Sequence, residues 1–192
     1  MHIAHVMLLR RSVLLFFTAA LASTTFAPRA DASVSVALSL DDLARSSAMV
    51  ARVTAVDRSS RWEDGRIVTY TRVRIDDPLA GAAMRGSELS VRTLGGIVDG
   101  VGQAVEGEAR LATGASSLLF LTEREGHTVV TGRAQGQLAI VRRADGREVV
   151  RTVPAGALVV RAPNRLPAAL EGRDAGDARA EIVRAWETTH AR

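Results

Sequence analysis

Few side chains in this 192-residue sequence could act as nucleophiles or as metal ligands. The chain has no cysteine and no lysine, which excludes a thiol nucleophile, a cysteine zinc site, a Schiff base and a phosphate-loop lysine. Of its four histidines, two lie beyond residue 32, namely His127 and His190. A serine triad would also need an elbow of the form G-x-S-x-G, which the sequence lacks. We therefore assign no catalytic residue, no metal ligand and no cofactor.

Paired carboxylates are the remaining acid–base candidates. None of the pairs has the spacing of a calcium loop, and helix caps and turns account for most of them. Asp76-Asp77-Pro78, for example, is predicted to end a strand and enter a turn. Because catalytic carboxylates can come from distant parts of a chain, a carboxylate-dependent hydrolase stays open as an alternative. The pairs are Asp41-Asp42, Glu63-Asp64, Asp76-Asp77, Glu106-Glu108 and Asp174-Asp177.

One glycine-rich stretch, Gly95–Gln103, has the composition of a ligand loop without its spacing. No Lys-Ser/Thr follows it, and Glu106 and Glu108 nearby would repel a phosphate. Glycine also serves wherever the backbone needs a positive φ. This stretch is therefore predicted to be a long irregular connection.

The polar stretch Arg58–Gly65 is predicted to be a loop between two strands. It places Trp62 next to Arg61 and Glu63, and aromatic and arginine side chains are typical of protein interfaces. A lone loop tryptophan can instead fold back and cap the end of a barrel. The sequence leaves both interpretations open.

The first 32 residues resemble an export signal. Arg10 and Arg11 precede a short apolar run, Val13 to Ala22, which is about half the length of a membrane-spanning helix. Cleavage could follow Ala22, Ala27 or Ala32, and we favour Ala32, with Ser33 as the new N-terminus. The arginine pair is also loosely similar to a twin-arginine signal. We expect a periplasmic or secreted protein without a membrane anchor after cleavage.

Charge gives no sign of a nucleic-acid partner. Removing residues 1–32 leaves a net charge of +2, with the basic residues spread along the chain and few aromatic side chains between them. The high isoelectric point, 11.0, follows from the exclusive use of arginine, which does not lose its proton near neutral pH. We therefore predict no nucleic-acid binding.

Short strands dominate the rest of the chain. Alternating apolar residues predict strands over 49–56, 67–75 and 89–93, the continuous run Leu118–Leu121 predicts the most buried strand, and four shorter strands follow up to residue 161. Ser39 is the predicted cap of a short helix, and a second helix is predicted over Asp174–Thr189. The chain is thus predicted to be mainly β, a small closed or partly open barrel over residues 33–162, with a linker and C-terminal helix over 163–192. A two-sheet sandwich is the alternative.

The order of these elements resembles the netrin-like module of tissue inhibitors of metalloproteinases, an OB-like barrel. The stretch Ser46–Val56 is similar to that family's first strand, and Arg72–Gly81 and Leu118–Leu121 are similar to later ones. The chain also looks like a group of exported bacterial proteins that share R-W-E-D-G-R-I-V-T, here Arg61 to Thr69. In the inhibitors, an N-terminal cysteine chelates the protease zinc, and Ser33 stands in that position here.

These observations predict an exported, non-enzymatic protein-binding domain. Its partner would be another exported protein, and the resemblance implies a metalloprotease as one candidate. The predicted partner-binding residues are Ser33, Arg58, Arg61, Trp62 and Glu63. An envelope structural domain without a discrete ligand is the third alternative.

Overall fold

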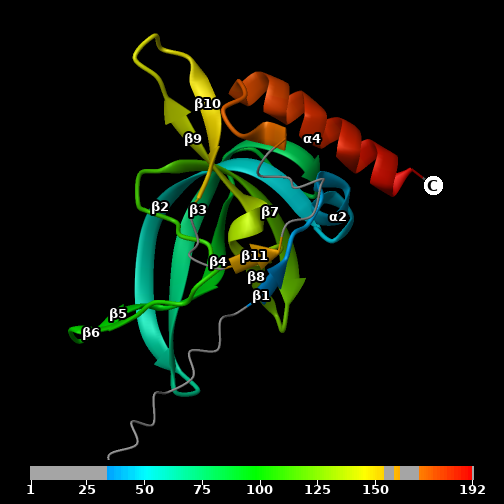
Figure 1. The fold of residues 1–192 in the computed structure, drawn as a ribbon. Helices are drawn as coiled ribbons and strands as arrows, with labels where there is room; N and C mark the ends of the chain where they lie inside the picture. The colour runs from blue at the N-terminus through cyan, green and yellow to red at the C-terminus, as the bar shows by residue number, and fades with distance from the viewer. Residues whose placement is uncertain (1–33, 154–157, 161–168, 192) are drawn as a thin grey trace, which may run out of the picture. The chain divides into compact units, whose positions relative to one another are not determined.

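The computed structural model describes residues 34–153, 158–160 and 169–191, which all belong to one compact unit, Ala32–Arg192. The predicted signal peptide, Ser33 and most of the predicted linker lie outside the described residues. The described part of this unit is mainly β and includes the α-helices α2 and α4 and a short 3-10 helix (Figure 1). Its elements are β1 (Val34–Val36), α2 (Leu40–Arg45), β2 (Met49–Glu63), β3 (Arg66–Gly81), β4 (Glu88–Leu94), β5 (Gly96–Val98), β6 (Val101–Gln103), β7 (Ser116–Arg124), β8 (His127–Val130), η1 (Arg133–Gly136), β9 (Gln137–Arg142), β10 (Glu148–Thr152), β11 (Leu158–Val160) and α4 (Ala175–His190).

Five strands form a partly closed barrel. Their order is β2-β3-β4-β8-β7, and β7 returns to pair with β2. All neighbours are antiparallel except β4 and β8, which run parallel and pair only at Val91–Thr128 and Arg92–Val129. This is an OB-like strand order, and the short β4–β8 contact leaves the barrel open along one seam. The predicted barrel class is confirmed.

The strands β2 and β3 form a long ribbon. They pair from Met49–Gly81 to Glu63–Arg66 and are joined by Asp64 and Gly65, whose φ values of 47° and 74° suit a two-residue hairpin turn. The predicted loop at Arg58–Gly65 is therefore wrong, because residues 58–63 continue the strand. The predicted turn at Asp76-Asp77-Pro78 is wrong for the same reason: β3 runs on to Gly81.

The core has two layers separated by β2 and β7. One face of these strands points into the barrel, where Val53 and Leu119 pack with Val73 and Val91. The other face packs against the helices, and there Phe120 meets residues of α2, α4 and β9. A strand buried on both faces reads as a continuous apolar run, and Leu118–Leu121 is at most 2% exposed, as predicted.

The helix α2 begins directly after its predicted cap, Ser39, and α4 begins directly after Asp174, the first residue of its predicted range. Ser39 accepts a hydrogen bond from the Asp42 amide while the Asp42 side chain accepts one from the Ser39 amide, which is a complete capping box. Asp174 caps α4 through the Gly176 amide, and Ala178 and Ile182 of α4 are fully buried against the outer core layer. Figure 1 shows α4 lying across this side of the barrel.

The glycine-rich stretch forms a small hairpin rather than an irregular connection. β5 and β6 pair through Ile97–Gly102 and Val98–Val101, with Asp99 and Gly100 at the turn. This hairpin lies against the β2–β3 ribbon, because Gln103 Oε1 accepts a hydrogen bond of 2.6 Å from the Ile67 amide. It projects beside the ribbon at the lower left of Figure 1.

Candidate functional site

The distal half of the β2–β3 ribbon has two different faces. The inner face continues the barrel interior and carries Arg58, Ser60 and Trp62 on β2, opposite Thr71, Thr69 and Ile67 on β3. The outer face carries Arg61 and Glu63 together with Tyr70 of β3 and Arg92 of β4. Because successive residues of a strand point to opposite faces, Arg61 and Trp62 are separated by the ribbon itself.

The outer face is tied together by charge. Glu63 accepts hydrogen bonds from Arg61 Nε at 2.7 Å, from the Tyr70 hydroxyl at 2.9 Å and from Arg92 Nη2 at 3.2 Å. The Arg61 guanidinium also lies over the Tyr70 ring, 4.4 Å from its centroid. These donors, Arg61 first, lower the pKa of Glu63 to about 2. Glu63 is therefore ionised and saturated with donors at neutral pH.

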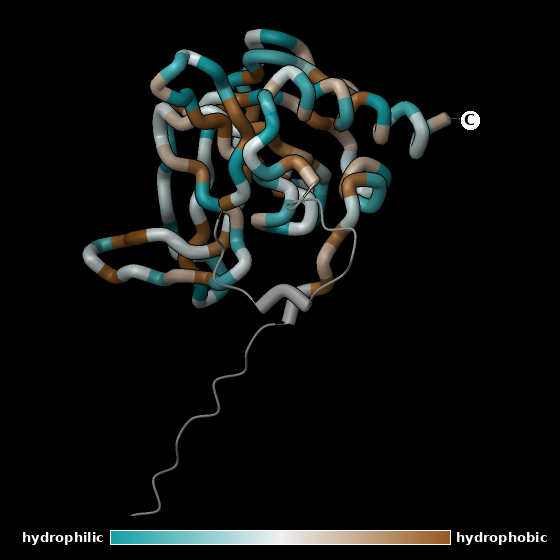
Figure 2. The backbone as a smooth tube through the Cα atoms, turned by 45° about the horizontal axis from the view of Figure 1, so that its top comes forward, coloured by the Kyte–Doolittle hydropathy of each residue, from teal (hydrophilic) through white to brown (hydrophobic). Residues whose placement is uncertain are grey.

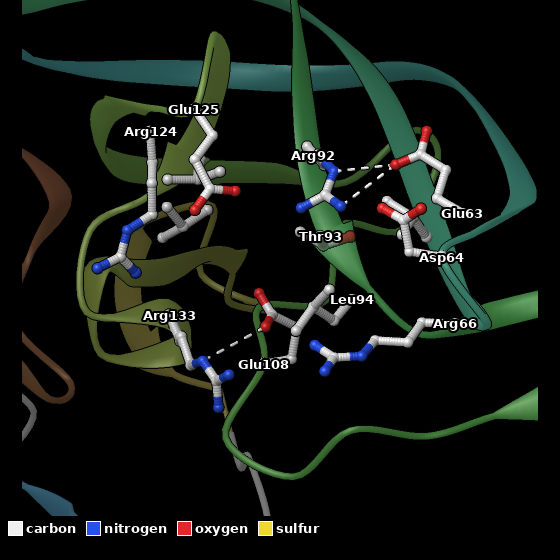
Figure 3. A pocket seen from close by; sticks show the side chains of 13 residues that line it. Glu63, Asp64, Arg66, Arg92, Thr93, Leu94, Glu108, Arg124, Glu125 and Arg133 are labelled. Atoms are coloured by element: carbon white, nitrogen blue, oxygen red, sulfur yellow. Dashed lines mark hydrogen bonds and ion pairs between the residues drawn. The ribbon is translucent and has the colours of Figure 1, made fainter.

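A charged pocket lies beside this network, at the open seam of the barrel (Figure 3). It has a volume of about 510 Å³, and arginines alternate with carboxylates around it. Glu108 is 8% exposed, and burial raises the pKa of its carboxyl although Arg133 lies 3.6 Å away. The charged residues of this outer pocket are Glu63, Asp64, Arg66, Arg92, Glu108, Arg124, Glu125 and Arg133.

The inner face presents apolar side chains to solvent. Trp62 is 51% exposed and belongs to neither core layer. Beside it, the β5–β6 hairpin exposes Ile97 and Val101, and Figure 2 shows hydrophobic stretches along this projecting hairpin. Among the described residues, the other exposed large apolar side chains are Val36 on β1, Val141 on β9 and Met84 in the connection between β3 and β4. We call Trp62, Ile97 and Val101 the apolar patch.

A second pocket opens on the same inner face. It has a volume of about 610 Å³ and lies between the ribbon, the end of β4, the start of β5 and the segment 103–112. Four hydroxyl side chains line it, those of Ser60, Thr69, Thr71 and Thr93, together with Ala109 and Leu111 of the core. We call this the inner pocket.

Unpaired arginines gather around the two pockets. Most arginines of the described chain form ion pairs, which is expected when both signs of charge are interspersed on a surface. Four arginines form no ion pair among the described residues and line one of the pockets. Arg58 and Arg110 line the inner pocket, and Arg66 and Arg124 line the outer pocket. Unpaired guanidiniums at the rim of a cavity are available to an anionic group of a ligand or partner.

The structure brings together only part of the predicted site. Arg58 and Trp62 share the inner face, whereas Arg61 and Glu63 lie on the outer face, bonded to each other. Ser33 lies outside the described residues. Sequence reasoning missed Ile97 and Val101, although the Asp99-Gly100 dipeptide between two apolar stretches was a readable hairpin signal.

The described residues give no sign of a metal centre or a membrane span. No group of three or more histidine, aspartate or glutamate side chains is placed to hold a metal ion in residues 34–153, 158–160 and 169–191. In that same part of the chain, no helix has the length and apolar character needed to cross a bilayer.

Comparison with known proteins adds no further assignment. The chain matches no family model, no curated protein and no solved structure.

Proposed function

We propose that this protein is an exported, non-enzymatic domain that binds another exported protein through the inner face of the β2–β3 ribbon. The observation that carries the proposal is the apolar patch: Trp62, Ile97 and Val101 are each at least half exposed on two hairpins that pack against each other. Exposed apolar groups gathered at one place and flanked by polar residues mark interaction surfaces.

The position of Trp62 favours the anchor interpretation over the cap interpretation. A tryptophan that capped the barrel would lose most of its exposure and join the core, but 51% of Trp62 is exposed and it lies near the ribbon tip. Large aromatic side chains at the centre of an interface contribute a large share of the binding free energy. The unpaired Arg58 on the same face suits a partner with acidic groups around an apolar centre.

Export rests on the sequence of residues 1–32, and the resemblance to netrin-like inhibitors suggests an exported metalloprotease as the first partner to test. The inner face does not depend on that choice. A cysteine-free N-terminus at Ser33 would chelate a protease zinc only weakly, so contact through Trp62 is the stronger expectation.

The test is capture of the partner from the envelope and culture fluid of the producing cell, followed by affinity measurement. Trp62→Ala should weaken binding by about 2 kcal/mol while the melting temperature stays within a few degrees. Met84→Ala is the matched control, because Met84 is 71% exposed but lies beyond the barrel end of β3, away from the ribbon tip. Early unfolding of Trp62→Ala with normal binding by the folded fraction would overturn the proposal.

A carboxylate-dependent hydrolase is the second candidate, and one observation favours it. The outer pocket holds two carboxyls whose pKa values move in opposite directions, with Glu63 lowered and Glu108 raised. Against this, Glu63 is already bonded to three donors, which leaves it a poor base. Hydrolysis of chromogenic glycoside or ester substrates that disappears in Glu108→Gln would favour the enzyme.

A further inference from the structure

The inner pocket has the size and lining of a ligand site. Its volume of about 610 Å³ lies in the range of roughly 300–1,000 Å³ that is typical of small-molecule pockets. It combines apolar core residues with four hydroxyl side chains, whereas the interior of a small barrel is filled with packed side chains. The four hydroxyl side chains in this pocket therefore call for a structural or functional explanation.

Three of the four hydroxyls are used within the protein. Ser60 and Thr69 bond to each other at 2.8 Å, Thr69 donates to the Gly95 carbonyl at 2.6 Å, and Thr93 donates to the Thr69 carbonyl at 3.4 Å. These bonds hold the ribbon, β4 and the start of β5 together. They account for the presence of polar side chains at those three positions.

Thr71 is the exception. It is 1% exposed, it lines the inner pocket, and its hydroxyl has no hydrogen-bond partner among the described residues. Among the described residues, Ser116 Oγ is the side-chain oxygen that is fully enclosed and also has no hydrogen-bond partner. Because the Thr71 hydroxyl oxygen has no partner either but is not fully enclosed, it remains open to the cavity. Valine has the same shape as threonine and would fill this strand position without leaving a polar group unpaired.

Positive charge stands next to this hydroxyl. Arg58 is the direct cross-strand neighbour of Thr71 on the inner face, and Arg110 lines the same pocket from the opposite segment. Neither guanidinium forms an ion pair among the described residues. Glu108 also lines the pocket, so a doubly charged phosphate would be repelled more strongly than a group with a single negative charge.

We propose that the inner pocket binds a carboxylate that carries a neighbouring hydrogen-bonding group. Arg58 and Arg110 bind the carboxylate, and the Thr71 hydroxyl bonds to the neighbouring group. Two sources offer this chemistry: a free small organic acid, or an acidic side chain of a bound protein. An acidic side chain of a bound protein can reach the inner pocket, because Ile97 belongs both to the pocket wall and to the apolar patch.

The experiment titrates the isotope-labelled full chain, as processed by the producing cell, with two matched pairs of probes. D-Glucuronate is compared with D-glucose, which differs from it in lacking the carboxylate. A blocked pentapeptide with one central glutamate is compared with its glutamine counterpart. We expect resonances of Thr71 and Thr93 to shift with a charged probe and not with its neutral counterpart. A response to glucuronate indicates a free acid as the source, and a response to the glutamate peptide indicates a protein side chain.

Substitutions then test the assigned contacts. Arg58→Gln and Arg110→Gln should each weaken binding roughly tenfold or more, the usual effect of losing a charge-assisted hydrogen bond. Arg143→Gln is the matched control, because Arg143 is also exposed and without an ion pair among the described residues but lies in the β9–β10 turn. Thr71→Val should weaken binding while leaving the denaturation midpoint unchanged or higher, since no internal bond is lost.

Three results would overturn the proposal: no shift with either charged probe, equal shifts with charged and neutral probes, or binding that survives both arginine substitutions. Loss of stability in Thr71→Val would also overturn the role given to its hydroxyl, and Thr71→Ser then serves as the binding control. The site is tested on the purified chain without a protein partner. A negative result for the inner pocket therefore does not contradict partner binding through Trp62. A negative result for Trp62 likewise does not contradict ligand binding in the inner pocket.

Discussion

Arg61 and Trp62 are neighbours in the chain but lie on opposite faces of the β2–β3 ribbon. Arg61 is bonded to Glu63 and stacked on Tyr70, so its charge is used within the fold. Trp62 has neither role and remains half exposed. The sequence predicted that both residues bind a partner. In the structure, Arg61 has a structural role, and Trp62 remains the candidate anchor.

The stabilising effect of Glu63 should depend on pH. Its pKa is about 2 in the folded protein against an ordinary value of 4.5, so the ionised form is favoured by folding. The stabilisation is fully present above pH 4.5 and is lost as the pH falls towards 2. We expect Glu63→Gln to be less stable than the wild type at neutral pH, by a difference that shrinks as the pH falls from 4.5 through about 2, as measured by urea denaturation. A stability difference that does not change across this window would show that the donors do not hold the carboxylate.

Phe120 should be among the most costly positions to truncate. It is fully buried on β7, between the barrel and the two helices. Phe120→Ala removes a large side chain from a packed layer and should lower the free energy of unfolding by about 3–5 kcal/mol. Val141→Ala on the exposed part of β9 is the control and should change it by less than about 0.5 kcal/mol. An unchanged denaturation midpoint for Phe120→Ala would mean that the outer core layer is misplaced.

Periodicity predicted most strands and the C-terminal helix because burial in this fold is regular, whereas the short helix α2 was predicted from its cap, Ser39. Alternation over Met49–Val56 and Ile67–Ile75 reflects one face packed in the barrel, and the continuous run at Leu118–Leu121 reflects burial on both faces. The polar composition of Arg58–Glu63 hid the rest of β2. Those residues pair with a strongly β-forming segment, Ile67–Thr71, so the tertiary partner rather than local propensity extends the strand.

The candidate site could not be predicted from the sequence because a β-bulge determines it. The register shifts between Ala55 and Asp57, which leaves Val56 as the extra residue. Without that shift, the alternation that points Val53 and Ala55 inward would put Arg61 on the inner face and Trp62 on the outer one. The one extra residue of the bulge therefore determines which side chains of β2 face the β5–β6 hairpin. The hydrophobic pattern of the sequence does not indicate where this bulge lies.

Gly81 should tolerate no side chain. It ends β3 with a φ of 75°, and a Cβ there would overlap the carbonyl oxygen of Ala48 and lie 2.8 Å from Met49 Cα. Gly86 has a similar φ of 82° but open space around it, so Gly86→Ala measures the conformational cost alone, about 1–2 kcal/mol. We expect Gly81→Ala to lower the melting temperature clearly more than Gly86→Ala. Equal effects would show that β2 and β3 can separate at this end without loss.

Glu108 should affect stability in the opposite direction from Glu63. Burial raises the pKa of its carboxyl above the ordinary 4.5, so the folded protein holds this proton more tightly than the unfolded chain does. Below pH 4.5 both states are protonated and the group costs nothing. As the pH rises, the unfolded chain ionises first, and the wild type becomes less stable until the pH passes the raised value.

Replacing Glu108 by glutamine removes this ionisation and nearly keeps the shape of the side chain. The stability of Glu108→Gln relative to the wild type should therefore increase as the pH rises from about 4 to neutrality, measured by urea denaturation at each pH. Arg133, whose Nε lies 3.6 Å from the carboxylate, partly offsets the cost of burial. Arg133→Gln should consequently make the pH-dependent loss of stability in the wild type larger, and should leave that of Glu108→Gln unchanged. A relative stability of Glu108→Gln that stays constant across this range would show that the carboxyl is better solvated than its 8% exposure indicates.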